Sequence, residues 1–389
     1  MTHQGCKAIP GARTINDWIG AGGETIAGNS NCESSVAAAD DRFERKLMKA
    51  ELPLGVRVVV IDEVWLNSAE RLAMMLKWHA TKYKRVRLWL CGDVGQIVKK
   101  KRPWLTASFA TFRCRAKVVY LSKNYRIGQG EDVLAGLQTA IRYGRLEGSE
   151  WEPVWRMIMK RDKSTCRQIF TAAVSTNVKE ANDRARAENI DLISIRQVKK
   201  VSSGGETCVG PTVRIGVGSR VMTTRLATDT KFVVRPPKTI GTVSYINAVH
   251  ADDPPQDDDE NGAVMLATNV AVGIVMDDGE AFELRGAESS TINKEGKVIK
   301  STSIFVANAT ALTVHMVQGM NPLRGRVYFN ANNAMEPCCF YVYITRLKFL
   351  KDAASNGTPS RVDELAMRPD QRQFEEELRS LAVNFPARI

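Results

Sequence analysis

The chain has 389 residues, of which 44% are hydrophobic and 25% charged, and its formal net charge is +12. This length predicts two or three domains with full cores, and the composition is typical of a globular protein. No run approaches the roughly 18 apolar residues of a membrane span, and Met1–Pro10 lacks the apolar core of a signal peptide. The positive charge favours a polyanionic partner, either nucleic acid or a membrane surface.

The eight cysteines are scattered along the chain, and only Cys338 and Cys339 are adjacent. The sequence has no C-x-x-C pair, so the spacing indicates neither a zinc site nor a disulfide framework. We therefore expect reduced thiols in an intracellular compartment and no secretion.

The first part of the chain alternates strand and helix patterns. Val56–Val64 (VRVVVIDEV) is a near-continuous β-branched run and predicts a strand buried on both faces. Ala69–Tyr83 has helical spacing, and Arg87–Cys91 and Lys117–Leu121 predict two more strands. This alternation predicts an α/β fold with a parallel sheet.

The second part begins in the same style. Its predicted elements are a helix, a strand, a helix and two later α/β segments, at Gly128–Gly144, Ile169–Ser175, Ala181–Glu188, Ala311–Val314 and Arg326–Asn330. Between about Leu226 and Ser303 the pattern changes to short alternating strands, which predicts an inserted β module. An amphipathic helix near Asp370–Val383 closes the chain.

Two acidic residues, Asp62 and Glu63, follow the first predicted strand. Ligands of open α/β sheets bind beyond the carboxyl ends of the strands. There an Asp can hold Mg²⁺ on nucleotide phosphates, and a following Glu can orient or deprotonate the attacking water. A solvated turn at the strand end explains this dipeptide equally well.

A second polar segment, Gly92–Gln96, follows the next predicted strand. A Gln at this position can reach a γ-phosphate or its attacking water, whereas an ordinary Gly-Asp turn is the alternative. Two such segments on adjacent strands are harder to explain by chance than either one alone.

Arg126 follows the predicted strand at Lys117–Leu121, and Arg346 follows the apolar run Tyr341–Thr345, which also predicts a strand. Arginines from a second lobe can neutralise charge on a transferring phosphoryl group. Each arginine alone is better explained as a surface residue, and His315 alone as a core histidine.

In order along the chain, these segments resemble the conserved motifs of superfamily 1 helicases of the RecD/Pif-type branch. VVVIDEV resembles motif II, LWLCGDVGQI motif III, LSKNYR motif IV, ALTVHMVQGM motif V and YVYITRLK motif VI. The first 20 residues resemble motif Ia, with Asn16 in place of the usual His of a T-I-H turn. The resemblance extends to about Ala354.

The resemblance implies a role for each matching residue. Asp62 would hold Mg²⁺ with ATP, Glu63 would activate water, Gln96 would sense the γ-phosphate, and Arg126 and Arg346 would be arginine fingers. Gln318 and Gly319 would join the nucleotide site, and the single strand would be contacted by Thr2, Thr14, Thr313 and His315.

The resemblance also implies an architecture. We expect two RecA-like parallel-sheet domains of the P-loop NTPase fold, at residues 1–116 and at 117–225 with 304–355, with the first incomplete. A small β-barrel-like module would occupy residues 226–303, and a tail with a helix would occupy residues 356–389.

The Walker A loop, G-x-x-x-x-G-K-[ST], does not occur in this sequence. Its backbone amides and Lys would cradle the phosphates. In the family this loop lies shortly before motif Ia, so we expect the chain to be a fragment that binds ATP poorly by itself.

The function implied by the resemblance is ATP-dependent 5′–3′ unwinding of DNA by a monomeric motor that acts on single strands and duplex junctions, in repair, recombination or replication. Two alternatives remain open: an inactive remnant that binds nucleic acid without turnover, and a viral superfamily 1 RNA helicase. No membrane partner is expected.

Overall fold

A computed structural model describes residues 41, 43–97, 104, 106–121, 124, 126–171, 174–201, 207–224, 227–228, 234–235, 239–249, 256–258, 262–276, 279–292, 298–318 and 325–382. The chain forms two compact units. Unit 1 comprises Met1–Ser164, Val314–Leu323 and Phe329–Ile389, and unit 2 comprises Thr165–Thr313 and Arg324–Tyr328. Thr2, Thr14 and Gly319 lie outside the described residues.

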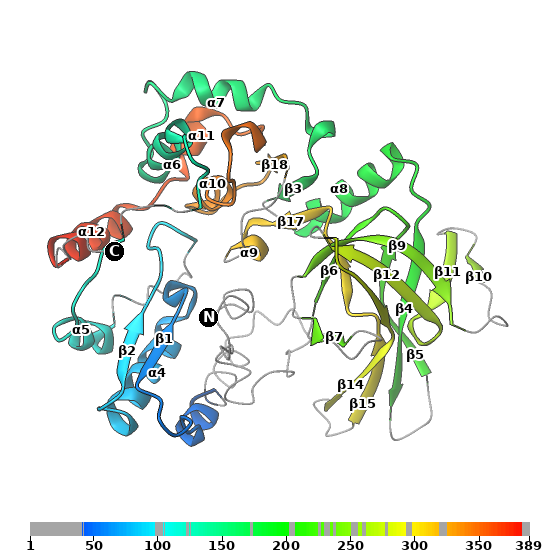
Figure 1. The fold of residues 1–389 in the computed structure, drawn as a ribbon, viewed down its shortest axis with the longest axis horizontal. Helices are drawn as coiled ribbons and strands as arrows, with labels where there is room; N and C mark the ends of the chain where they lie inside the picture. Colours follow the sequence, from blue (N-terminus) through cyan, green and yellow to red (C-terminus); the bar gives the residue numbers. More distant parts are fainter. Residues whose placement is uncertain are drawn as a thin grey trace. The chain divides into compact units, whose positions relative to one another are not determined.

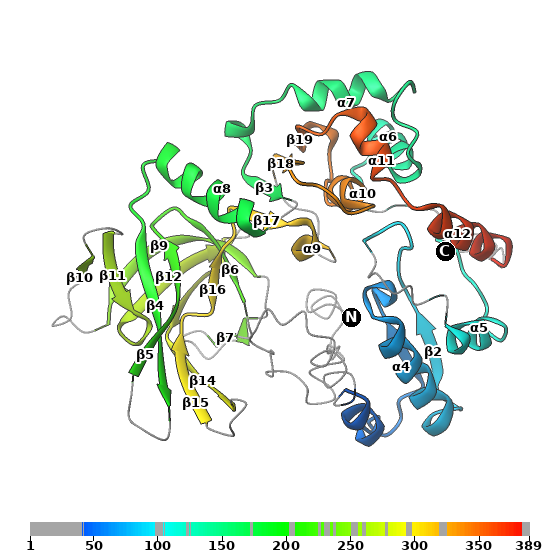
Figure 2. The same ribbon diagram turned by 180° about the vertical axis from the view of Figure 1, so that it is seen from behind.

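The first part of unit 1 is a parallel strand pair with a helix beside it. Strand β1 (Val58–Ile61) pairs in parallel with β2 (Arg87–Leu90), and Val58 is opposite Arg87. Helix α4 (Ala69–Lys82) begins at Ser68, whose side chain accepts a hydrogen bond from the Arg71 amide. Figures 1 and 2 show α4 lying along this strand pair. The three predicted elements are confirmed.

Two expectations for this region are wrong. The β1–β2 pair is not buried on both faces, since Val58, Val60 and Trp89 are 39, 37 and 56% exposed; in the part of the chain that the structure describes, this sheet has only two strands. Lys117–Leu121 is not a strand. Val118 makes an isolated bridge to Ala382, and the apolar Leu121 is 86% exposed, so this run pairs with no strand among the described residues.

The rest of unit 1 is mainly helical around the short strand β19 (Ala353–Ser355). Its helices are η1 (Val64–Leu66), α5 (Ala107–Arg113), α6 (Asp132–Tyr143), α7 (Glu152–Met159), α9 (Val314–Val317), α10 (Cys339–Ile344), η5 (Leu350–Asp352), α11 (Pro359–Glu364) and α12 (Pro369–Ser380). Helix η3 (Lys163–Thr165) leads along the chain into unit 2.

The run before Arg346 is a helix, α10, and not the strand that its apolar residues predicted. Phe340, Val342, Tyr343 and Ile344 are all completely buried. A short helix buried on every side shows the same unbroken apolar run as a buried strand, so periodicity cannot separate the two.

An aromatic cluster joins three helical elements of unit 1. The Trp65 ring lies 5.8 Å from that of Trp104, 5.5 Å from Phe109 and 5.4 Å from Phe374, all edge to face. These rings are at most 7% exposed. Trp65 and Trp104 therefore serve the core, as expected for most tryptophans here, and they anchor α12 against α5 and η1.

Unit 2 contains a second parallel strand pair. Strand β3 (Gln168–Thr171) pairs with β17 (Ala311–Thr313), and Ile169 is opposite Ala311. Helix α8 (Val174–Ala187) follows β3, so the strand ends earlier and the helix begins earlier than the sequence predicted. Strand β18 (Val327–Asn330) carries the chain from unit 2 into unit 1.

The remainder of unit 2 is a β module that already begins at residue 193, whereas the sequence predicted an inserted module between about Leu226 and Ser303. One sheet has the order β10-β11-β4-β15-β14 with β5 beside β4, and another the order β13-β12-β9-β6-β16, with a separate β7-β8 pair. Their bounds are β4 (Ile193–Val201), β5 (Thr207–Ile215), β6 (Arg220–Thr223), β7 (Ala227–Thr228), β8 (Val234–Arg235), β9 (Ile240–Ala248), β10 (Gln256–Asp258), β11 (Gly262–Leu266), β12 (Val270–Met276), β13 (Ala281–Arg285), β14 (Ala287–Ile292), β15 (Val298–Ser303) and β16 (Val306–Asn308), with the short helix η4 (Ala267–Asn269).

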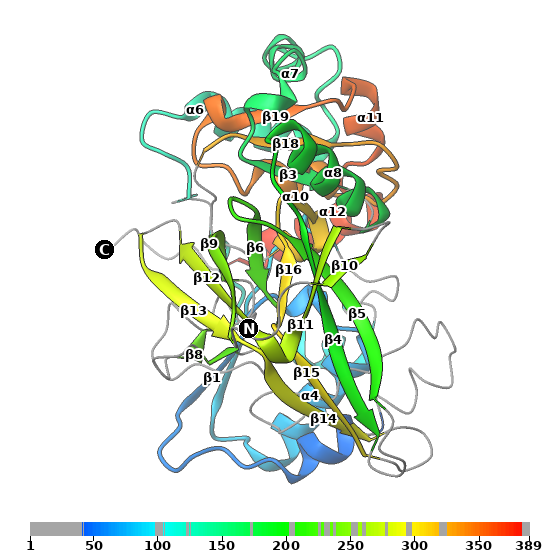
Figure 3. The ribbon, with the colours of Figure 1, turned by 90° about the vertical axis from the view of Figure 1, so that its right-hand side faces the viewer.

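The module has one shared apolar core. Ile195 and Ile215 from the first sheet pack with Val243, Val272 and Phe282 from the second. Figure 3 shows the long ribbons of both sheets within unit 2. The described strands form two open sheets that pack on each other and no closed barrel, which corrects the barrel-like expectation.

Candidate functional site

Asp62 and Glu63 lie at the carboxyl end of β1, where it meets the end of β2. The Cys91 amide donates to the Ile61 carbonyl at 2.8 Å, and the Val64 amide donates to the Cys91 carbonyl at 2.9 Å. These bonds turn the chain sharply, so Glu63 takes a left-handed conformation with φ 49° and ψ 43°. A non-glycine residue in this conformation is strained, and such strain concentrates at functional sites.

The Glu63 carboxyl is electrostatically linked to four charged groups. Burial, and then the Asp62 carboxylate, raise the pKa of Glu63, and Asp93 adds to the rise. The Arg346 and Arg126 guanidiniums act in the opposite direction. Four of the predicted catalytic residues therefore influence one another electrostatically: Asp62, Glu63, Arg126 and Arg346.

Arg346 is one of the most buried side chains of unit 1, at 1% exposure. Burial and the neighbouring Arg126 lower the pKa of Arg346 to about 10, whereas Glu63 raises it. Its Nη2 donates to Thr345 Oγ1 at 3.1 Å. A buried guanidinium beside a carboxylate is suited to an anionic ligand such as a phosphoryl group.

Arg126 is exposed, and side-chain amides fix the turn before it. Asn124 Oδ1 accepts from the Arg126 amide at 3.0 Å, and Asn124 Nδ2 donates to Gln138 Oε1 at 3.1 Å. Gln138 Nε2 in turn donates to the Ile344 carbonyl at 3.1 Å. This chain of bonds connects the turn of Arg126 to the end of α10, where Arg346 lies.

The two predicted glutamines form a direct pair. Gln318 Nε2 donates to Gln96 Oε1 at 3.0 Å and to the Ile97 carbonyl at 3.1 Å. Both side chains are buried, at 3 and 6% exposure. Gln371 from α12 supports the same loop, since its Nε2 donates to the Val94 carbonyl at 2.9 Å.

A charged network beside this pair was not predicted from the sequence. Asp93 Oδ1 accepts from Arg142 Nη1 at 2.7 Å, and Asp93 Oδ2 accepts from the Tyr341 hydroxyl at 2.9 Å. Arg142 also forms an ion pair with Glu375 of α12, at 3.0 Å. Burial lowers the pKa of Arg142, but Tyr341, Asp93 and Glu375 together outweigh burial and leave this pKa raised. In the sequence these residues show only a Gly-Asp turn and two amphipathic helices, and nothing there pairs them.

Cys338 lies against α12. It has a left-handed backbone, with φ 67°, and its Sγ is 3.9 Å from Gln371 Oε1. Burial raises the pKa of the Cys338 thiol, and likewise that of Cys339, to about 12.

The predicted strand-contacting residues differ in exposure. His315 in α9 is half exposed, and its Nε2 lies 2.8 Å from Glu336 Oε2. Thr313 ends β17 in unit 2 and is 5% exposed. Their proposed contacts with nucleic acid stay predictions.

The donor set fits a magnesium–nucleotide complex. No group of three or more His, Cys, Asp and Glu residues in the described ranges could hold a metal ion alone. Mg²⁺ is typically bound by one or two carboxylates together with nucleotide phosphates and water, which is what Asp62 and Glu63 offer. None of the described helices is long and apolar enough to cross a membrane.

No protein-family model and no curated protein matches the sequence. Solved structures do match the fold. A Pif1 helicase from Candida albicans aligns with a TM-score of 0.66 at 15% identity, over 95% of this chain and 85% of that one.

Two structures of a Bacteroides Pif1 helicase also align. One, bound to ssDNA, has a TM-score of 0.59 at 16% identity, covering 95% of this chain and 84% of that one. Another, with ADP-AlF3 and ssDNA, has a TM-score of 0.56 at 15% identity, covering 87% and 78%. The chain therefore has a mixed α/β fold with parallel sheets that matches the RecA-like domains of these Pif1 helicases.

Proposed function

We propose that this chain is the motor core of an ATP-dependent nucleic-acid helicase that translocates 5′ to 3′ on single-stranded DNA. The observation that carries the proposal is the electrostatic linkage of the half-buried Glu63 carboxyl, at the end of β1, to Asp62, Arg126 and Arg346. The fold similarity to Pif1 helicases solved with ssDNA and with ADP-AlF3 supports the choice of substrate and nucleotide.

Each residue of the site has a chemical task in this proposal. Bound ATP with Mg²⁺ supplies the phosphoryl group that is transferred to water. Asp62 would hold the ion, and Glu63, whose pKa is raised by burial, is a stronger base for the proton of the attacking water. Arg126 and Arg346 would neutralise charge that develops on the phosphoryl oxygens.

The Gln96–Gln318 pair offers a way to transmit the nucleotide state. Gln96 follows the nucleotide-binding end of β2, whereas Gln318 ends the segment that resembles motif V. A change in the position of either amide must move or break their hydrogen bond. We propose that this bond couples ATP hydrolysis to the grip on the strand.

The test is ATP hydrolysis at low salt with and without a single-stranded oligonucleotide. Because the sequence contains no Walker A loop, this chain is compared with the same chain preceded by a Walker A strand, loop and helix. We expect strand-stimulated turnover in the extended chain and its loss in Asp62→Ala, whereas Glu150→Ala, an exposed carboxylate, retains it.

Unwinding of duplexes with a 5′ or a 3′ single-stranded tail checks the direction, and matched RNA duplexes check the substrate. Turnover that ignores Asp62→Ala contradicts the site, and absence of turnover in both chains supports an inactive remnant instead.

A further inference from the structure

The end of the β1–β2 pair opposite the candidate site carries a group of cationic side chains, here called the basic edge. Its members are Arg57, Lys82, Lys84, Arg85 and Arg87, and all five are exposed. Because β1 and β2 run in parallel, both strands start at the same edge of the sheet, and the basic edge lies there. Asp62 and Gln96 follow the ends of these strands, at the opposite edge. Four residues of extended chain span about 13 Å, so the basic edge is separate from the nucleotide site.

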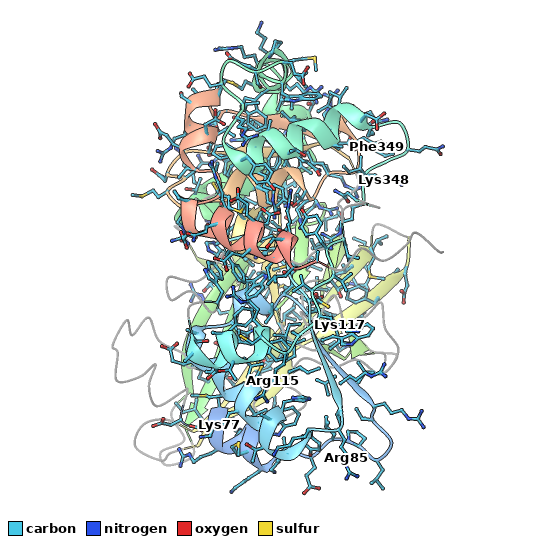
Figure 4. The ribbon with its side chains drawn as sticks, turned by 90° about the vertical axis from the view of Figure 1, so that its left-hand side faces the viewer. Lys77, Arg85, Arg115, Lys117, Lys348 and Phe349 are labelled. Atoms are coloured by element: carbon cyan, nitrogen blue, oxygen red, sulfur yellow. The ribbon has the colours of Figure 1, made fainter. Side chains whose placement is uncertain are left out.

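The turn that presents these charges is held in place from within. The Tyr83 hydroxyl accepts from the Leu52 amide at 2.9 Å, and the Val86 amide donates to the Tyr83 carbonyl at 2.9 Å. His79 Nε2 lies 2.7 Å from the Val86 carbonyl oxygen. Lys84 and Arg85 therefore form a fixed tip between two anchored residues, and Figure 4 shows Arg85 at this end of unit 1.

Among the residues that the structure describes, no carboxylate pairs with the basic edge. Lys77, one helical turn before Lys82, pairs with Glu44 at 3.2 Å, but within the described ranges no ion pair joins any of the five basic-edge residues to a carboxylate. Glu51, which lies next to the Tyr83 anchor at Leu52, also forms no ion pair with them. Five neighbouring cations without counter-charges make a local positive field that attracts a polyanion.

The kind of polyanion follows from the chemistry of the tip. Proteins that bind single strands interleave cations with exposed aromatic rings that stack on bases. The aromatic residue of this turn, Tyr83, is instead engaged by its hydroxyl and packs on Trp78, with ring centroids 4.8 Å apart. Trp89, two residues beyond Arg87 on β2, is 56% exposed, but the tip itself, Lys84 and Arg85, offers cations alone. Contacts by cations alone suit the regularly spaced phosphates of a duplex.

We propose that the basic edge is a second nucleic-acid contact that binds the phosphate backbone of a duplex without reading its sequence. This contact requires no nucleotide and none of the residues of the candidate site. It can therefore be present or absent whether or not the chain hydrolyses ATP.

The experiment measures binding of a fluorescein-labelled, blunt 20-base-pair DNA duplex by anisotropy, without nucleotide, over a series of salt concentrations. The double variant Lys84→Ala/Arg85→Ala should bind about tenfold more weakly, and the slope of log Kd against log salt should fall by about two, because about 0.9 counterion is released per phosphate contact. A second variant, Lys82→Ala/Arg87→Ala, should behave in the same way.

The matched control is Lys160→Ala/Lys179→Ala, which removes the same charge from exposed positions elsewhere. It should leave affinity and slope nearly unchanged. If the control and the basic-edge variants lost affinity for the duplex equally, net charge alone would explain the loss, and the proposal would be overturned. Unchanged duplex binding, a larger loss for a single strand than for the duplex, or a loss seen only with phosphatidylserine vesicles would also overturn it.

Discussion

Gln318 Nε2 donates a 3.0 Å hydrogen bond to Gln96 Oε1, across 222 residues of sequence and inside the core of unit 1. Both glutamines were expected at one site on the strength of their motifs, and the structure adds that they touch. The same Gln318 nitrogen also binds the Ile97 carbonyl, so one amide group serves both the side chain and the backbone of the loop after β2.

The coupling between these glutamines can be measured by a double-mutant cycle. Gln96→Ala and Gln318→Ala should each lower the free energy of unfolding by about 1–3 kcal/mol, because each leaves a buried polar group without a partner. The double variant should lose less than the sum, with a coupling of about 0.5–1.5 kcal/mol. Urea unfolding of the four proteins gives these values. Simple additivity would show that the pair does not interact in solution.

Arg142 is expected to be a large contributor to the stability of unit 1. Arg142→Met removes the guanidinium that joins Asp93 to the 4% exposed side chain of Glu375 and, among the described residues, leaves Glu375 with Arg379 alone as its ion-pair partner. Breaking a buried ion pair in this way costs about 3–5 kcal/mol. Chemical unfolding should show this loss, whereas Arg156→Ala, in the exposed pair with Glu152, should change little. A small loss in Arg142→Met would mean that water replaces the guanidinium.

Glu63→Gln should stabilise the fold at neutral pH. The pKa of Glu63 is raised by burial above its unfolded value, so the ionised carboxylate is a cost in the folded state. That cost is complete above the folded pKa and disappears below the unfolded pKa, near 4.5. Thermal unfolding at pH 7 should therefore show a more stable variant, and the two proteins should converge toward pH 4. A variant that is less stable at pH 7 would mean that attraction to Arg346 and Arg126 outweighs burial.

Arg346→Ala should separate binding from turnover, provided that the proposed function is correct. In the chain that carries a Walker A segment, we expect ATP hydrolysis to fall by about 10³-fold or more, as for removal of an arginine finger, with nucleotide binding retained. Binding of a fluorescent ATP analogue and single-turnover hydrolysis check the two quantities. If both fell together, Arg346 would be a structural residue of α10, as its 1% exposure allows.

The sequence predicted the strand–helix–strand at Val58–Leu90, because β-branched runs and helical spacing carry that information. The shared site of Asp62, Glu63 and Arg346 was implied by the resemblance alone and stays a prediction. The sequence-based prediction was wrong where tertiary contacts determine the secondary structure of an apolar run. The run at Lys117–Leu121 pairs with no strand among the described residues, and the apolar run at Cys339–Ile344 is a mostly buried helix.

The residues of α12 that support the site could not be predicted from the sequence either. Gln371 and Glu375 repeat at helical spacing on α12 and are indistinguishable in sequence from a solvated polar face. Only the fold shows that Glu375 meets Arg142 and that Gln371 meets the loop of Gln96. Pairings over more than 200 residues leave no local pattern that a single sequence could reveal.

The buried thiol of Cys338 makes the local opening of α12 measurable by chemical modification. Burial raises its pKa to about 12, and its Sγ lies 3.9 Å from Oε1 of Gln371 in α12. We expect an alkylating reagent to reach Cys338 only when α12 dissociates locally, whereas Cys114 is exposed and should react immediately. Mass spectrometry can follow the two modification rates. The slower rate, at Cys338, then measures how often α12 dissociates locally, and repeating the experiment with nucleotide shows whether the nucleotide slows this opening.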